Sequence, residues 1–276
     1  MKRASEMTGI GRSIDFDYPS NRAVFFLTLA VIGLGIGFRM IGGRGIIPAV
    51  LWGLGAGVAV FLAWALGREM DPDNDSSAFL AAGVALIVIF LWGIPSLGML
   101  FWLLVAVRIL NRTTGTVPTV LDSLVFLSLG GGISYRGNWI VGLLTAVVFL
   151  LDSRLPQGKR RSLVFAAMSA AASAASLIWG KELMIGMNIS WRAVGIALWI
   201  SVVFLPVILR SRQMKSEMDK TGEKLISVRI QAGQALAASF LILTALWGGM
   251  EALISVLPVG AAAGGAGVFY FFSRYS

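Results

Sequence analysis

Long apolar runs separated by short polar connections extend over most of the chain. Gly, Pro and charged residues end these runs, and tight turns are expected at Gly42-Gly-Arg-Gly45 and Gly93-Ile-Pro-Ser96. A helix needs about 20 apolar residues to cross the hydrocarbon core of a bilayer, with a range of about 17 to 25. The pattern predicts an all-α, polytopic membrane helix bundle with about ten transmembrane helices, at 23–41, 46–66, 77–94, 97–111, 117–133, 139–151, 163–181, 190–209, 230–249 and 252–272.

The distribution of Lys and Arg supports this number of crossings, because cytoplasmic loops of membrane proteins retain positive charge. With a cytoplasmic N-terminus, 18 of the 23 basic residues lie inside, and the outer side holds Arg39, Arg44, Arg136, Lys181 and Arg192. Both termini are therefore expected in the cytoplasm. The chain is expected to consist of a cytoplasmic N-terminal segment at 1–22 and one transmembrane domain at 23–272, with cytoplasmic loops at 67–77, 108–118, 152–162 and 210–229.

Composition agrees with a multi-pass protein of the cell membrane, in contact with membrane lipids. Hydrophobic residues make up 57% of the chain and charged residues 13%, whereas about a quarter of the residues in soluble domains are charged. The net charge of +9 is explained by basic cytoplasmic loops, so no nucleic-acid partner is expected. Cys and His are absent, which excludes disulfides, thiolate chemistry, imidazole metal sites and catalytic triads with a His base. Any metal would be a hard cation held by oxygen.

Four carboxylates crowd into the loop at 67–77, namely Glu69, Asp71, Asp73 and Asp75. Groups this close repel one another, so a divalent cation, arginines or open water must compensate them. One interpretation is a Mg²⁺ site shared with a phosphate-bearing ligand. The alternative is a capped turn, in which Pro72 stiffens the chain and Asp75 or Ser76 caps the next helix.

The loop at 108–118 combines two arginines with several threonines. Arg108 and Arg112 are four residues apart and are expected to share a helix face, while Thr113 and Thr114 add hydroxyl groups. Guanidinium groups bind phosphate oxygens in bidentate fashion, so the loop has the chemistry of a phosphate cradle. The alternative is ordinary anchoring by positive charge, with Thr116 as the N-cap of the following helix.

Two further aspartates lie close to apolar segments. Asp122 falls just inside the segment at 117–133, where an ionised group costs about 2.5–3.5 kcal/mol, so it is expected to face a cavity or a cation such as Arg112. Asp152 opens the third polar loop, which continues through Arg154. The long loop at 210–229 carries charges of both signs and is predicted to be a solvated amphipathic linker resting on anionic headgroups.

The polar loops after the second, fourth and sixth predicted helices resemble those of the intramembrane prenyltransferases that make quinones, haem O and archaeal ether lipids. In that family the first loop carries an Asp-rich motif for Mg²⁺ and diphosphate, the second often reads Lys-Arg-x-Thr-x-x-Pro, and the third holds a second acidic motif followed by basic residues. Here Asn111-Arg-Thr-Thr-Gly-Thr-Val-Pro118 is similar to the second motif. Asp71, Asp73 and Asp75 occupy the place of the first, at a spacing of two residues, and Asp152 with Lys159, Arg160 and Arg161 occupies that of the third.

The resemblance implies a Mg²⁺-dependent transferase that acts on a prenyl diphosphate or another phosphorylated lipid at the cytoplasmic face. Asp71, Asp73 and Asp75, with Asp152, would hold Mg²⁺, and Arg112 would join the three loop aspartates in catalysis. The substrate would be bound by Arg68, Arg108, Asn111, Thr113, Thr114, Asp122 and Arg154.

Two other functions fit the same sequence. A secondary transporter or exporter of a small or lipophilic metabolite would use glycine-rich helices that move against one another, with Asp122 as a coupling or substrate-binding group. A non-catalytic membrane subunit would need only solvated loops.

Overall fold

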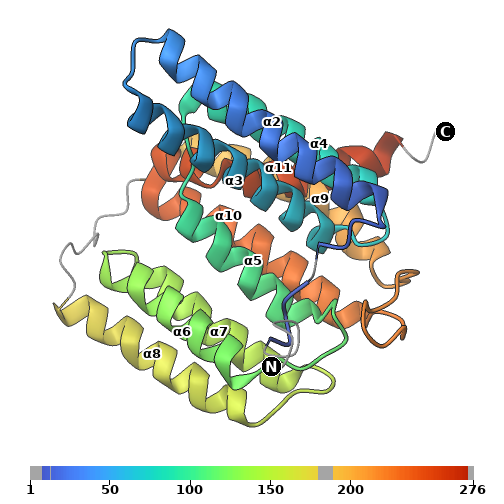
Figure 1. The fold of residues 1–276 in the computed structure, drawn as a ribbon. Helices are drawn as coiled ribbons and strands as arrows, with labels where there is room; N and C mark the ends of the chain where they lie inside the picture. The colour runs from blue at the N-terminus through green and yellow to red at the C-terminus, as the bar shows by residue number, and fades with distance from the viewer. Residues whose placement is uncertain (1–7, 13, 180–188, 273–276) are drawn as a thin grey trace, which may run out of the picture. The chain divides into compact units, whose positions relative to one another are not determined.

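A computed structural model describes residues 8–12, 14–179 and 189–272. These residues form ten α-helices, with an isolated antiparallel bridge between Glu217 and Lys224 (Figure 1). The helices are α2 (Pro19–Ile41), α3 (Ile46–Met70), α4 (Asp75–Trp92), α5 (Leu97–Asn111), α6 (Val120–Tyr135), α7 (Trp139–Arg154), α8 (Arg161–Trp179), α9 (Trp191–Arg210), α10 (Ser227–Ser255) and α11 (Leu257–Phe272).

The predicted all-α class and the ten helical segments are confirmed for the described part of the chain. The segment at 97–111 matches α5 at both ends, whereas α3 continues to Met70 and α10 begins at Ser227. Helix α6 begins at Val120, three residues after the predicted start. Residue 180 and Lys181 of the predicted segment 163–181 lie outside the described residues, as do residues 1–7 and 13 of the predicted segment 1–22.

Six of the described helices are long and apolar enough to span a membrane: α2, α3, α4, α8, α9 and α10. Helices α6 and α11 have 16 residues each, which at 1.5 Å per residue gives about 24 Å, less than the hydrocarbon thickness of about 30 Å. Many large apolar side chains are exposed on the long helices, such as Phe26, Leu34 and Ile41 on α2. The chain has the features of an integral membrane protein, and ten full crossings remain a prediction.

The described residues fall into two compact units. Unit 1 contains residues 8–12, 102–179 and 209–236, and therefore α6, α7, α8, most of α5 and the start of α10. Unit 2 contains residues 14–101, 189–208 and 237–272, and therefore α2, α3, α4, α11, most of α9 and the rest of α10.

Glycines allow close packing between α2 and α3 in unit 2. A Cβ atom at Gly53 would lie 2.7 Å from the carbonyl oxygen of Ile32, and one at Gly57 would collide with the Ile32 side chain. By contrast, a Cβ at Gly33 would meet no atom within 4 Å. Where lipid supplies no hydrophobic drive between helices, this close backbone approach stabilises the pair through van der Waals contact.

Helix α10 is interrupted within unit 2. Gly249 has φ 62° and ψ −147°, so the helical backbone breaks there before it resumes toward Ser255. The Ser255 carbonyl accepts a hydrogen bond from the Ser96 amide at 2.7 Å. The irregular end of α10 and the turn between α4 and α5 are thereby tied together.

In unit 1, α6, α7 and α8 lie side by side (Figure 1). Trp102 stacks on Phe126 and donates its indole N–H to Thr145 Oγ1 at 2.9 Å. Ser134 and Ser176 share a hydrogen bond of 2.7 Å between α6 and α8. Because buried hydroxyl groups need partners, these bonds fix how the three helices pack.

A matched pair of substitutions tests the glycine packing. Gly53→Ala should lower the thermal unfolding midpoint, because overpacking costs about 1–3 kcal/mol. Gly33→Ala should leave the midpoint unchanged or raise it, since Ala favours a helix by about 1 kcal/mol over Gly. Thermal unfolding of the detergent-purified variants checks this, and equal effects at both positions would contradict the packing described.

The natural absence of cysteine makes the predicted orientation directly measurable. In intact cells, a membrane-impermeant maleimide should label Arg44→Cys, in the predicted outer loop, and should not label Lys224→Cys. Permeabilised cells should show labelling of both variants. The opposite pattern in intact cells would place the 210–229 loop outside and overturn the prediction of cytoplasmic termini.

Candidate functional site

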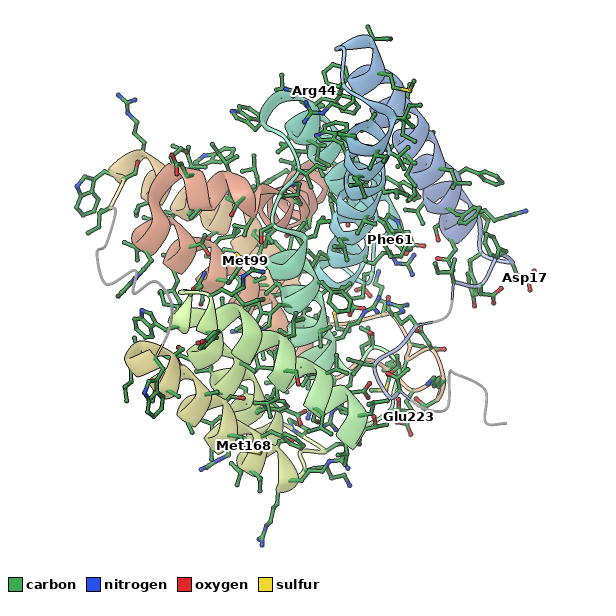
Figure 2. The ribbon with its side chains drawn as sticks, turned by 60° about the vertical axis from the view of Figure 1, so that its left-hand side comes forward. Asp17, Arg44, Phe61, Met99, Met168 and Glu223 are labelled. Carbon is green, nitrogen blue, oxygen red and sulfur yellow. The ribbon has the colours of Figure 1, made fainter. Side chains whose placement is uncertain are left out.

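The polar loops of unit 1 meet where the C-termini of α5 and α7 and the N-termini of α6, α8 and α10 come together. Arg112, just after α5, binds the loop after α7, and Arg161 at the start of α8 donates to the carbonyl of Pro118 before α6. Figure 2 labels Glu223, which lies in the turn closed by the Glu217–Lys224 bridge, among side chains that end in nitrogen and oxygen.

The centre of this site is Asp152, which two arginines share. Its Oδ1 accepts from Arg112 Nη2 at 2.7 Å and from Arg229 Nη1 at 3.1 Å, and its Oδ2 accepts from the Ser162 hydroxyl at 2.8 Å. All three charged side chains are almost fully buried, with residue exposures of 1% for Arg112, 0% for Arg229 and 2% for Asp152. Two guanidinium groups face one carboxylate, so the cluster carries an excess positive charge.

Helix C-termini offset that excess. Arg229 donates to the carbonyls of Leu110 at 2.9 Å and Pro156 at 2.8 Å, and Arg112 donates to that of Gln157 at 2.8 Å. The last carbonyls of a helix carry a partial negative charge and lack intrahelical partners. Arg229 therefore caps the end of α5 at Leu110 and contacts the Asp152 carbonyl in the last turn of α7 at 3.4 Å. The Pro156 and Gln157 carbonyls belong to the loop after α7.

Arg112 does not share a helix face with Arg108, contrary to the prediction. Helix α5 ends at Asn111, and Arg112 has a left-handed φ of 52°. Its amide still donates to the Arg108 carbonyl at 3.0 Å, which closes the last turn. The change in backbone direction turns the side chain away from the helix surface and into the cluster with Asp152.

Asp122 is the third residue of α6 and forms a capping box, so it does not lie deep within a span. It accepts from the Thr119 amide at 2.7 Å, and the Thr119 hydroxyl accepts from the Asp122 amide at 3.2 Å. The helix N-cap is therefore Thr119, and the predicted cap at Thr116 is wrong. Arg112 pairs with Asp152 and not with Asp122. The Asp122 carboxylate also accepts hydrogen bonds from Thr8 and Gly9.

The N-terminal segment at 8–12 lies against the α5–α6 loop. The Thr8 hydroxyl donates to Asp122 Oδ1 at 2.5 Å and the Gly9 amide donates to Oδ2 at 2.8 Å. In return, the Gly9 carbonyl accepts from the hydroxyls of Thr114 and Thr116, each at 2.6 Å. Residues far apart in sequence thus satisfy the polar groups of this loop.

Residues 211–226 fold back on the same loop. Most of their side chains are exposed, as predicted for an amphipathic linker, while an apolar side packs inward. Met214, Met218, Leu225 and Ile230 make a small apolar core beneath the Glu217–Lys224 bridge. The amides of Asp219 and Lys220 donate to the carbonyls of Thr113 and Thr114, at 3.0 and 3.2 Å. Asp219 also pairs with Arg12 through two contacts, of 2.7 and 2.8 Å.

The acidic loop lies in unit 2, where local partners compensate part of its charge. Arg68 pairs with Asp75 at 2.5 Å, and the Asn74 amide group donates to both carboxylate oxygens of Asp71 at 2.9 Å. Asn74 occupies the N-cap of α4 without a side-chain cap bond, so Asp75 and Ser76 are not the cap. Glu69 is fully buried.

The acidic loop fits Mg²⁺ only in part. In the described part of the chain, no group of three or more acidic side chains is placed to hold a metal ion. Mg²⁺ is usually bound by one or two carboxylates together with phosphate oxygens and water, a demand that this loop could meet once a phosphate is present. Asp152, the fourth predicted ligand, belongs to unit 1 and gives its oxygens to two arginines and a serine.

The predicted site residues thus separate into two groups. Unit 1 brings together Asn111, Arg112, Thr113, Thr114, Asp122 and Asp152, with Arg108 in the last turn of α5 and Arg154 exposed at the end of α7; unit 2 holds Arg68, Asp71, Asp73 and Asp75.

Sequence reasoning missed Arg229, Thr8 and Asp219. A charge at the edge of an apolar helix could have drawn attention to Arg229. Nothing in the sequence pairs residue 8 with residue 122.

Comparison of the chain with protein-family models, with curated proteins and with solved structures finds no match.

Replacing the central carboxylate should destabilise the protein strongly. Asp152→Asn leaves two buried guanidinium groups without their anion, and breaking a buried ion pair costs about 3–5 kcal/mol, which corresponds to a loss of about 10 °C in the unfolding midpoint. The control is Asp219→Asn, which removes the more exposed pair with Arg12 and should cost about 0–1 kcal/mol. A similar loss for both variants, measured by thermal unfolding in detergent, would argue against Asp152 as the centre.

Proposed function

We propose that this chain is a multi-pass protein of the cell membrane that acts on a phosphorylated lipid, most concretely as a transferase of a prenyl diphosphate, with the polar end of unit 1 binding the phosphate. Six long apolar helices support the membrane location. The finer assignment is supported by the chemistry of the loops that meet in unit 1.

One observation carries the proposal: the loops after α5 and α7 are joined directly. Their counterparts in the family that the sequence resembles carry the Lys-Arg-x-Thr-x-x-Pro motif and the second acidic motif. Arg112 donates both to Asp152 and to the Gln157 carbonyl. The joined loops present more guanidinium than carboxylate groups, and exposed Arg154 and Lys159 add positive charge at their edge. An anion approaching this end therefore meets a favourable potential.

In the proposed reaction, the bond between the allylic carbon and the diphosphate oxygen breaks, and the electron pair leaves with the diphosphate. Positive groups placed where this negative charge develops lower the barrier. Arg108 and Arg154 would contact the leaving group, with Thr114 as a hydroxyl donor. The acceptor then supplies an electron pair to the allylic carbon and loses a proton, which an oxygen of the released diphosphate can take, so the reaction needs no histidine base.

Asp152 takes a different role in this proposal from the one that the sequence resemblance implied. Because its oxygens bind Arg112, Arg229 and Ser162, it positions the arginines rather than holding the metal. The aspartates of the acidic loop in unit 2, Asp71, Asp73 and Asp75, would hold Mg²⁺ only together with phosphate oxygens and water. When bound, such an ion would supply charge compensation to a phosphate group.

Transport is the second candidate function, and one feature of unit 2 favours it. Carriers often bind their substrates at interrupted helices, where freed backbone groups become available. Helix α10 has such an interruption at Gly249. Asp122 no longer supports this reading as a coupling group within a span, because it lies in the first turn of α6 as part of a capping box.

Binding of inorganic diphosphate tests the proposal. With Mg²⁺ and diphosphate at about 100 times the dissociation constant, ligand binding adds about 2.7 kcal/mol and should raise the unfolding midpoint of the detergent-purified protein by about 5 °C. Asp71→Asn/Asp73→Asn/Asp75→Asn should abolish the part of the shift that requires Mg²⁺. Arg108→Gln and Arg154→Gln should each reduce the total shift in the unfolding midpoint.

The matched control is Asp17→Asn, an exposed aspartate outside the proposed site, which should keep the full shift. Gly9→Ala should displace the N-terminal segment from the α5–α6 loop, because its Cβ would collide with the Val117 carbonyl oxygen. Absence of a shift at millimolar diphosphate in both the wild-type protein and Gly9→Ala would reject phosphate binding and leave transport as the better function.

A further inference from the structure

The hydroxyl groups best suited to bind a phosphate in unit 1 are covered by the chain's own N-terminal segment. The Gly9 carbonyl oxygen receives both the Thr114 and the Thr116 hydroxyls at 2.6 Å. Two short donor bonds that converge on one oxygen are also what these threonines would offer to a phosphate oxygen. In the described state, Gly9 thus occupies the place that such a ligand atom would take.

The segment is held at both ends. On one side, Thr8 and the Gly9 amide bind Asp122. On the other, Arg12 pairs with Asp219 on the folded 211–226 segment, while Ile10 is buried between these attachments at 8% exposure. Its five residues, 8–12, therefore cover the α5–α6 loop without belonging to any helix.

We propose that residues 8–12 form a displaceable strap that occupies the phosphate subsite at Thr114 and Thr116 and regulates access to it. This inference rests on the proposed function, because it assigns the regulation of that same site. The ligand class is a phosphate or diphosphate group, whose charged oxygens accept hydrogen bonds about twice as strong as those of a neutral carbonyl. Binding releases the Gly9 carbonyl, and the strap leaves the loop.

A closed strap lowers the apparent affinity for the ligand by the fraction of molecules that are open. The contacts at the two ends of the strap set the open fraction. One is with Asp122, which already has a partner in its own helix cap, and the other is the partly exposed ion pair between Arg12 and Asp219. Because Asp122 keeps its capping box when the strap leaves, α6 is not expected to unravel. The strap can therefore open without loss of the fold.

Gly9 is the position at which the strap can be disrupted with the smallest chemical change. A Cβ atom there would collide with the Val117 carbonyl oxygen and lie 3.2 Å from the Pro118 Cα atom, both backbone atoms. Gly9→Ala should therefore shift the segment toward the open state. Thr114 and Thr116, which would bind the phosphate, remain intact in this variant.

The experiment compares affinity for inorganic diphosphate, in the presence of Mg²⁺, between the full-length wild-type protein and Gly9→Ala, using the ligand-dependent unfolding midpoint. Gly9→Ala should bind at least about tenfold more tightly, because its open fraction is larger. Arg12→Ala, which removes the attachment to Asp219, should show a smaller gain of about two- to fivefold.

A second measurement does not require any change at Gly9. Ile10→Cys, in a chain that has no other cysteine, should react slowly with a maleimide, and saturating diphosphate should accelerate the reaction at least about fivefold as the strap opens. Ile14→Cys is the control, because Ile14 is already 43% exposed and its rate should not change. This measurement decides the question if Gly9→Ala does not fold.

The outcomes separate the two proposals. If diphosphate binds the wild-type protein and Gly9→Ala equally, and the Ile10→Cys rate does not rise, the strap is rejected while phosphate binding stands. If diphosphate binds neither the wild-type protein nor Gly9→Ala, both proposals fall. Tighter binding by Gly9→Ala, or faster labelling of Ile10→Cys with ligand, supports the strap.

Discussion

The organisation of unit 1 depends on one carboxylate shared by two buried arginines. Asp152 lies near the end of α7, Arg112 follows α5 and Arg229 lies in the first turn of α10, so their contacts join three helices that are distant in sequence. Burying such charges is costly unless each is paired and hydrogen-bonded. The arginines meet this requirement by also binding backbone carbonyls at the end of α5 and in the loop after α7. Charge pairing and helix capping are therefore one interaction in this protein.

This arrangement explains why the phosphate-binding chemistry of the sequence is buried in the structure. Arg112, Thr113 and Thr114 each have exposures of 3% or less, and their polar groups take part in contacts within the chain. These residues can bind a ligand only if a segment of the chain that now covers them moves away. The N-terminal segment is the suitable part, since it contributes no helix and its neighbours keep their own capping bonds without it.

Unit 2 resolves its crowded carboxylates differently. Asp75 has Arg68 as its ion-pair partner, and Asp71 receives both hydrogen bonds from the Asn74 side chain. The compensation is local, within one short turn between α3 and α4. The sequence allows a divalent cation, arginines or open water to compensate these carboxylates, and for Asp75 the structure uses an arginine. Mg²⁺ bound by the other aspartates would depend on a phosphate brought by a ligand.

The sequence by itself determined the all-helical class, the ten helical segments and the apolar character of the chain, because helix formation and membrane burial follow from local composition and run length. It also identified Arg112, Asp122 and Asp152 as polar residues that need partners. Only the tertiary structure decided which partners they have. Arg112 leaves the helix through a left-handed backbone step, Asp122 turns to its own helix cap and the N-terminal segment, and Asp152 is completed by Arg229, 77 residues away. Such pairings depend on how the helices pack, and no local pattern of residues encodes that.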